Sequence, residues 1–171
     1  MSVKGKGAKR KGSRAEIQFR NMLRSIYPVE DHKNVFRVPL SGAGAMKCDV
    51  QDNNDPMMAY EVKNQEKLCL PEWWRQAKSQ AGRVRTPVLV VTQSFRPFYI
   101  IMHKKDFLGL LENSIYKGHE TTEILTSTRN FMDRLAELDN HCMAEFLLDD
   151  DTVVAVTSRF YLEIKEDLLT S

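Results

Sequence analysis

The segment CDVQDNNDPMMAYEVK, residues 48–63, contains two short apolar runs separated by a polar stretch. Asn, Asp and Pro favour tight turns, whereas β-branched and aromatic residues favour strands. We therefore expect a strand around 48–51, a turn at DNNDP and a second strand from 57 to 63. Two strands joined by such a turn form an antiparallel hairpin, and the rest of the fold is built outward from it.

Three ionisable side chains lie on this predicted hairpin. Residues two apart on a strand point to the same face, so Glu61 and Lys63 should project together, and Asp49 can face Glu61 across the turn. Two carboxylates supply the hard oxygen ligands that Mg²⁺ prefers, and a lysine beside them can orient a water or stabilise developing charge. Alone, a Glu-x-Lys pair is common on exposed edge strands, so the pattern is informative only together with its surroundings.

The segments on both sides of the hairpin alternate between helical and strand patterns. Ser13 and Glu16 have capping-box spacing and begin a predicted helix over about 14–27. The continuous apolar run TPVLVVTQ is typical of a buried strand. In chain order we expect a helix at 14–27, a strand at 35–40, the hairpin, a helix at 70–85, strands at 86–93 and 96–103, a helix at 104–113, a long helix at 128–148, and strands at 152–158 and 160–166. This order predicts an α/β fold with a mixed sheet flanked by helices.

The charge is distributed unevenly along the chain. Residues 1–100 contain 18 Lys/Arg and 9 Asp/Glu, whereas residues 101–171 contain 7 and 14. The opening MSVKGKGAKRKGSR has six basic residues, three glycines and no acidic residue, which favours a mobile arm at 1–12 that contacts phosphates over a solubilising tail or a localisation signal. We assign a core domain to 13–116 and a C-terminal extension of one helix and two strands to 117–171.

Further motifs upstream and downstream of the hairpin carry a family resemblance. KGSRAEIQFRNML, VFRVPLSGAGAMKCDV and AYEVKNQ resemble, in order and spacing, the archaeal-type Holliday junction resolvases of the PD-(D/E)XK nuclease superfamily, over about residues 10–103. The chain differs from the family at Cys48, because the PD-(D/E)XK signature has proline at that position. Residues 117–171 have no counterpart in the family. These departures fit a phage-encoded or other non-archaeal member.

The resemblance implies a restriction-endonuclease-like fold and a set of site residues. It makes Asp49 and Glu61 metal ligands, Lys63 the catalytic lysine, and Glu16 a helix-borne acid that reaches the same metal. The cofactor implied is Mg²⁺, with Mn²⁺ as an expected substitute. Candidate DNA contacts come from the basic arm, the Gly-rich loop and the family positions: Lys9, Arg10, Lys11, Arg14, Arg37, Ser41 and Lys47.

The activity implied is Mg²⁺-dependent resolution of four-way junctions by a homodimer, because two strands of a branched DNA must be cut by two sites. Alternatives are a nuclease of the same superfamily acting on single-stranded, flap or duplex DNA, and a non-catalytic DNA-binding module. The arginines are spread over loops and strands. We therefore expect the protein to select its DNA by the geometry of the DNA backbone, with only a modest preference for base sequence. Adjacent Trp73 and Trp74 are interpreted as part of the dimer interface.

Other classes of protein are disfavoured by the sequence. The chain has no apolar run long enough to span a membrane and no signal-peptide pattern, so we expect an intracellular protein. The loop SGAGAMK lacks the phosphate-binding pattern of nucleoside triphosphatases, so we expect no nucleotide cofactor. The three cysteines lack zinc-ligand spacing and are interpreted as reduced, mostly buried thiols.

Overall fold

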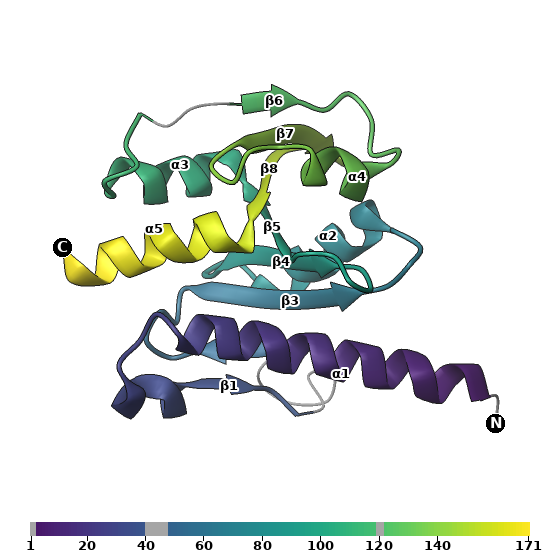
Figure 1. Cartoon of the computed structure of the whole chain (residues 1–171), viewed down its shortest axis with the longest axis horizontal. Coiled ribbons are helices and arrows are strands. Elements are labelled where there is room, and N and C mark those ends of the chain that lie inside the picture. Colours follow the sequence, from purple (N-terminus) through teal and green to yellow (C-terminus); the bar gives the residue numbers. More distant parts are fainter. Residues whose placement is uncertain (1–2, 40–47, 119–121) are drawn as a thin grey trace. The chain divides into compact units, whose positions relative to one another are not determined.

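The computed structural model describes residues 3–39, 48–118 and 122–171 (Figure 1). The chain divides into two compact units, Met1–Phe98 and Tyr99–Ser171. The division lies eighteen residues before the boundary expected at 116/117, so the second unit includes a strand and a helix that the sequence assigned to the core. Each unit contains four strands in parallel and antiparallel pairings, with helices packed against them, which confirms the α/β class.

The first unit contains four strands in sequential order. Its elements are α1 (Val3–Arg24), the 3₁₀ helix η1 (Val29–Asn34), β1 (Val35–Arg37), β2 (Val50–Asp52), β3 (Met58–Asn64), α2 (Leu70–Ala81) and β4 (Thr86–Thr92). The sheet order is β1-β2-β3-β4, antiparallel at the first two pairings and parallel between β3 and β4. The predicted hairpin is confirmed, with Val50 opposite Tyr60.

Helix α1 begins at Val3, eleven residues before the predicted start, and ends at Arg24. The segment expected to be a mobile arm is therefore helical from Val3 onward, because Lys, Arg and Ala are good helix formers and offset its three glycines. The inner face of α1 packs on the sheet: Ala15, Phe19 and Leu23 are fully buried, and the Phe19 and Tyr60 rings are 5.3 Å apart between centroids.

Helix α2 covers the β3–β4 part of the first unit's sheet. Pro71 lies at its first turn, and Gly82, with a φ of 69°, ends it, because glycine adopts positive φ without strain. Trp73 and Trp74 are 4% and 0% exposed. The interpretation of these two residues as a dimer interface is therefore wrong: both indoles are part of the apolar interior.

The second unit contains the elements β5 (Tyr99–His103), α3 (Lys104–Glu112), β6 (Thr122–Ile124), α4 (Phe131–Ala136), β7 (Met143–Leu148), β8 (Asp151–Thr157) and α5 (Ser158–Thr170). Its strand order is β5-β8-β7-β6, antiparallel except for the parallel pairing of β6 with β7. Phe131 of α4 packs edge-on against Phe146 of β7, and Phe107 of α3 packs against Phe160 of α5.

The long helix predicted at 128–148 is wrong. Only residues 131–136 are helical there, and Met143–Leu148 form β7. Where this helix was expected to end, residues 149–150 form a hairpin turn between β7 and β8, since Leu148 pairs with Asp151 and Asp149 has a φ of 52°. Aspartate tolerates this left-handed conformation better than most residues, so it suits a tight turn.

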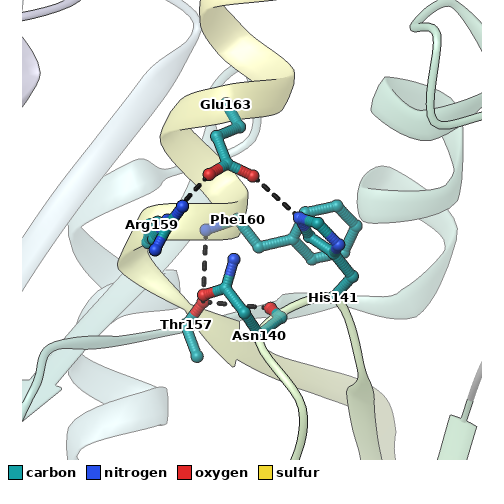
Figure 2. Close-up of polar contacts among 6 residues, drawn as sticks. All are labelled: Asn140, His141, Thr157, Arg159, Phe160 and Glu163. Atoms are coloured by element: carbon teal, nitrogen blue, oxygen red, sulfur yellow. Dashed lines mark hydrogen bonds and ion pairs between the residues drawn. The ribbon is translucent and has the colours of Figure 1, made fainter.

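The strand predicted at 160–166 is also wrong, because FYLEIKE lies within α5. The Thr157 hydroxyl accepts a hydrogen bond from the Phe160 N–H at 3.1 Å and donates to Asn140 Oδ1 at 2.7 Å, which caps the helix (Figure 2). The Glu163 carboxylate lies between Arg159 Nε and His141 Nε2, with one oxygen 2.9 Å from each nitrogen. The cap and these tertiary contacts outweigh the alternating apolar pattern that favoured a strand.

Two further expectations concern the whole described chain. Among the residues that the structure describes, no helix is long and apolar enough to cross a membrane. All three cysteines are free thiols, with Cys48 and Cys142 buried and Cys69 partly buried, as predicted.

Candidate active site

The hairpin of β2 and β3 holds Asp49 beside Glu61. Asp49 directly precedes β2, and its N–H donates to the Tyr60 carbonyl at 2.9 Å. Its side chain turns back to the same strand, where Oδ2 accepts a hydrogen bond from the Val62 N–H at 2.9 Å. In the turn, the Asn54 N–H donates to the Asp52 carboxylate at 3.0 Å and the Met58 N–H donates to the Asp55 carbonyl at 3.3 Å. The position of the Asp49 carboxylate is therefore set by main chain.

Glu61 and Lys63 lie on the face of β3 that α2 covers. The Lys63 ammonium is 2.5 Å from Glu61 Oε1 and donates to Gln76 Oε1 of α2 at 3.0 Å. Tyr60, the neighbour of Glu61, contacts Phe19 of α1 on the other face. The alternation of side chains along a strand thus accounts for the predicted pairing of the carboxylate with the lysine.

Glu61 is 1% exposed, and its pKa is raised to about 7. Burial is the largest cause, the negative charge of Asp49 adds to it, and Lys63 opposes both. Within the described part of the chain, Glu61 Oε2 is buried and has no hydrogen-bond partner. A buried carboxylate oxygen without a partner raises the free energy of the folded protein. A positive charge or a hydrogen-bond donor beside Glu61 Oε2 would remove this cost.

Glu16 is placed differently from the expectation that it joins the two hairpin acids. Its carboxylate forms an ion pair with the Arg37 guanidinium of β1, which also donates to the Ser13 hydroxyl at 3.1 Å. Arg37 pairs with Val50, and Val50 with Tyr60, so Arg37 shares the α1 face of the sheet. Among the described residues, no group of three or more His, Cys, Asp or Glu could hold a metal.

A second polar group lies beside the hairpin acids and was not singled out from the sequence. Arg85, between α2 and β4, donates to the Gln80 carbonyl at 2.7 Å and approaches Gln51 Oε1 at 3.5 Å and Cys48 Sγ at 3.9 Å. Burial raises the pKa of the Cys48 thiol, although Arg85 opposes the shift. Cys48 is therefore a neutral, buried neighbour of Asp49 at the position where the nuclease signature has proline.

Gln76 lies four residues before Gln80 on α2. The structure shows that it is the second partner of Lys63. Its spacing from Gln80 along the helix predicts a shared face but cannot predict which strand residue that face meets. Tertiary packing decides this contact, so no local pattern would have found it.

The predicted DNA contacts differ in their surroundings. Arg10 and Arg14 are exposed on α1, whereas the Lys11 ammonium is held by Glu66 Oε1 at 3.1 Å and Ser94 Oγ at 3.0 Å. Lys9 lies in the first half of α1. Ser41 and Lys47 lie outside the described residues. Arg37 is largely committed to Glu16 and Ser13, so it supports the site's framework.

The sequence model of the family described as "Phage putative PDDEXK endonuclease" matches residues 7–149, which is most of the chain. The match includes α1 from Gly7 onward, the β2–β3 hairpin and α2. No curated protein and no solved structure matches the chain significantly.

Proposed function

The chain belongs to the phage PDDEXK endonuclease family, and from this membership we propose that it is a magnesium-dependent DNA endonuclease with Asp49, Glu61 and Lys63 at its active site. The observation that carries the proposal is the state of Glu61. One of its oxygens is bound by Lys63, the other is buried without a partner, and a second carboxylate lies beside it. A structural role alone gives no reason to bury one acid directly beside a second, partly buried one.

The donor set fits a divalent cation. Asp49 and Glu61 provide hard carboxylate oxygens, and Mg²⁺ is commonly held by one or two carboxylates together with waters and substrate phosphate. A cation there would supply the charge that Glu61 Oε2 lacks, and Mn²⁺ should substitute because it accepts the same ligands. When bound, such a cation polarises a phosphate and lowers the pKa of a coordinated water.

The protein's own groups have separate tasks around this pair. The Val62 N–H fixes the Asp49 carboxylate, so that the acid is held before DNA arrives. Gln76 and Glu61 hold the Lys63 ammonium in place, where its charge can stabilise the negative charge that develops on the phosphate. Glu16 remains a candidate third ligand, but its ion pair with Arg37 favours a framework role.

The charge distribution favours a nucleic acid as substrate. Residues 1–98, which form the unit that contains the site, have 18 Lys/Arg against 9 Asp/Glu. Such an excess attracts a polyanion and contributes affinity that depends on salt. We propose that the protein acts inside the cell that contains the phage DNA.

The finer proposal is that the substrate is a four-way junction, cut by a homodimer. It rests on the resemblance of residues 10–103 to the archaeal-type resolvases. The burial of Trp73 and Trp74 removes one argument for the dimer. The proposal of a homodimer therefore rests on the resemblance and on the need for paired incisions. Nucleases of the same superfamily that cut flap, single-stranded or duplex DNA are the alternative.

The direct test incubates the protein with four-way, flap, single-stranded and duplex DNA, with and without Mg²⁺ or Mn²⁺. We expect metal-dependent cleavage, its loss in Asp49→Asn and Glu61→Gln, and DNA affinity that is equal or higher because a negative charge is removed. Glu30→Gln, an exposed acid on η1, is the matched control and should cut normally. Near wild-type cleavage by Asp49→Asn would place the active site elsewhere.

The same experiment separates the substrates. Two symmetric nicks across the branch, together with light scattering at about twice 19.8 kDa, would support the resolvase proposal. A monomer that cuts duplex as readily as the junction would retain the nuclease and exclude the resolvase. A protein that binds all four DNAs without cutting any would be a non-catalytic module.

A further inference from the structure

The outer face of α1 carries an ordered row of side chains. Arg10, Arg14, Gln18 and Asn21 follow one another at helical spacing of four, four and three residues, so they lie on one face. All four are exposed, and Ile17, 39% exposed, lies among them. The opposite face of the helix is buried in the first unit. We call the five residues Arg10, Arg14, Ile17, Gln18 and Asn21 the outer row.

The charge of α1 fits one kind of partner. Its 22 residues include eight Lys or Arg and a single acid, Glu16, which is paired with Arg37. The outer row therefore has positive and neutral polar groups and no negative one. Arg, Gln and Asn are also the side chains that form paired hydrogen bonds with guanine and adenine edges, and an apolar side chain can contact the thymine methyl group.

The shape of the helix fits the major groove of duplex DNA. An α-helix with its side chains is about 10–12 Å across, and that groove is about 12 Å wide. The row from Arg10 to Asn21 spans about 16 Å at 1.5 Å per residue, or roughly five base pairs at about 3.4 Å each. The first turns of α1 extend past the end of β3 that carries Lys63 (Figure 1). The outer row faces away from the sheet, so a duplex bound there would lie along the outer side of α1.

We propose that the outer row of α1 enters the major groove of duplex DNA and reads base edges, which makes α1 the specificity element of the nuclease. The proposal rests on the proposed function and deepens it by naming how DNA sequence is selected. It also replaces the expectation of modest sequence preference, because Arg10 and Arg14 lie on one exposed helix and not on scattered loops. Arg14 and Gln18 are at the centre of the row, with Arg10 and Asn21 at its ends.

Contacts at the two ends of the row support this arrangement. Asn21 Oδ1 accepts from the Arg20 guanidinium at 2.8 Å, which orients the amide on the exposed side. At the other end, Lys11 ties α1 to Glu66 and Ser94, in the loops that follow β3 and β4. The helix is thus held against the first unit at Lys11 and through Phe19, so the outer row is presented on a fixed support.

Two other partners fit the helix less well. A basic amphipathic helix can lie on an anionic membrane, but it does so with its apolar face, and Ala15, Phe19 and Leu23 are fully buried. Duplex RNA has a deep, narrow major groove that side chains cannot read. Both enter the experiment as competing outcomes.

The test uses the full chain with Asp49→Asn, so that DNA is bound without being cut. The protein selects duplexes from a pool with a randomised central stretch, and the selected sequence is compared with a scrambled one by fluorescence anisotropy. We expect a preference over about five base pairs. Gln18→Ala should weaken binding to the selected duplex by about five- to 150-fold, the range for one paired base contact, and change the scrambled duplex little.

Matched controls separate base reading from general charge. Arg129→Ala and Asn53→Ala remove an exposed cation and an exposed amide elsewhere in the chain, and should leave the preference intact. Thermal unfolding of each variant confirms that α1 is still folded. Anionic vesicles and duplex RNA of equal charge serve as competitors, and displacement of the selected duplex at equal concentration by either one would overturn the proposal.

Failure of this inference differs from failure of the proposed function. If the unaltered chain cleaves DNA but the selection yields no base preference, or Gln18→Ala binds both duplexes like the parent, the outer row is a solvated or phosphate-contacting face and the nuclease stands. If the unaltered chain cleaves no DNA in any metal, the proposed function fails whatever the selection shows.

Discussion

The backbone N–H of Val62 donates to Oδ2 of Asp49 at 2.9 Å, and Val62 is the residue between Glu61 and Lys63. One peptide group therefore links the acid at the start of β2 to the Glu-x-Lys pair of β3. The two carboxylates are held together although their charges repel, and the pKa of Glu61 is raised to about 7, mainly by burial and then by Asp49. This electrostatic cost should be measurable.

Stability should fall with pH because of Glu61. Its pKa is about 7 in the folded state and 4.5 as the ordinary value, so between these values the folded protein retains a proton that the unfolded chain has lost. The free energy of unfolding must then decrease as pH rises from about 4.5 to 7, and stay lower above 7. Glu61→Gln, measured by denaturant unfolding without metal, should gain stability relative to the unaltered chain between pH 5 and pH 8.5.

The control for this measurement is Glu30→Gln, because the Glu30 side chain is exposed. This substitution should change the free energy of unfolding by the same amount at pH 5 and at pH 8.5. Added Mg²⁺ should stabilise the unaltered chain more at pH 8.5 than at pH 5, because the ion binds the deprotonated acids, and Glu61→Gln should lose most of that gain. A pH-independent difference between Glu61→Gln and its parent would show that Glu61 is ionised throughout.

The ion pair between Glu16 and Arg37 allows the two roles of Glu16 to be separated. If Glu16 acts by holding Arg37, then Glu16→Gln, Arg37→Gln and the double variant should reduce cleavage by similar factors, because each breaks the same pair. If Glu16 is a metal ligand, Glu16→Gln should raise the Mg²⁺ concentration needed for half-maximal rate, and Arg37→Gln should not. Single-turnover cleavage across a Mg²⁺ titration distinguishes the two patterns.

Gln76 should position Lys63. A hydrogen bond to a charged group contributes about 1.5–3 kcal/mol, so Gln76→Ala should lower kcat about ten- to hundredfold if that contact is needed at the transition state. KM should change little, since the amide is not expected to contact DNA. Ser79→Ala, an exposed position on the same helix, is the control. Unchanged kcat in Gln76→Ala would mean that Glu61 alone is enough to hold the ammonium.

The hairpin and its acids could be predicted because their signals are local. The turn residues of DNNDP set the register, and the two-residue period of a strand places Glu61 with Lys63. Strand β4 was also predicted, from a continuous apolar run that is too short for a buried helix. In the second unit the same rules failed at residues 160–166, where Phe160, Leu162 and Ile164 alternate like strand residues but lie in α5.

What the sequence could not predict depends on tertiary contacts. The contacts Gln76–Lys63, Arg85–Gln51 and Glu16–Arg37 join different elements, 13 to 34 positions apart along the chain. The first turns of α1 are another example. Their glycines and lysines favour a disordered arm by composition, and the structure continues the helix through them, with Lys11 bound to Glu66 and Ser94.

That contact changes what the basic segment should contribute to DNA binding. Each Lys or Arg that neutralises a phosphate contributes about 0.9 to the slope of log K against log[salt]. Deleting residues 1–11 removes five basic side chains, so affinity should fall and the slope should become shallower by up to ~4–5. Cleavage at saturating protein should persist, because Asp49, Glu61 and Lys63 remain.

Single substitutions within the same helix refine this prediction. Arg10 is exposed, whereas the Lys11 ammonium already has a carboxylate at 3.1 Å, so a phosphate must displace Glu66 to reach it. Arg10→Ala should therefore lower the slope by about 0.9 and Lys11→Ala by clearly less. Glu66→Gln should strengthen DNA binding and restore the full contribution of Lys11. Binding titrations between about 50 and 200 mM salt measure all three, and equal slopes for Arg10→Ala and Lys11→Ala would show that Glu66 does not compete with DNA for the lysine.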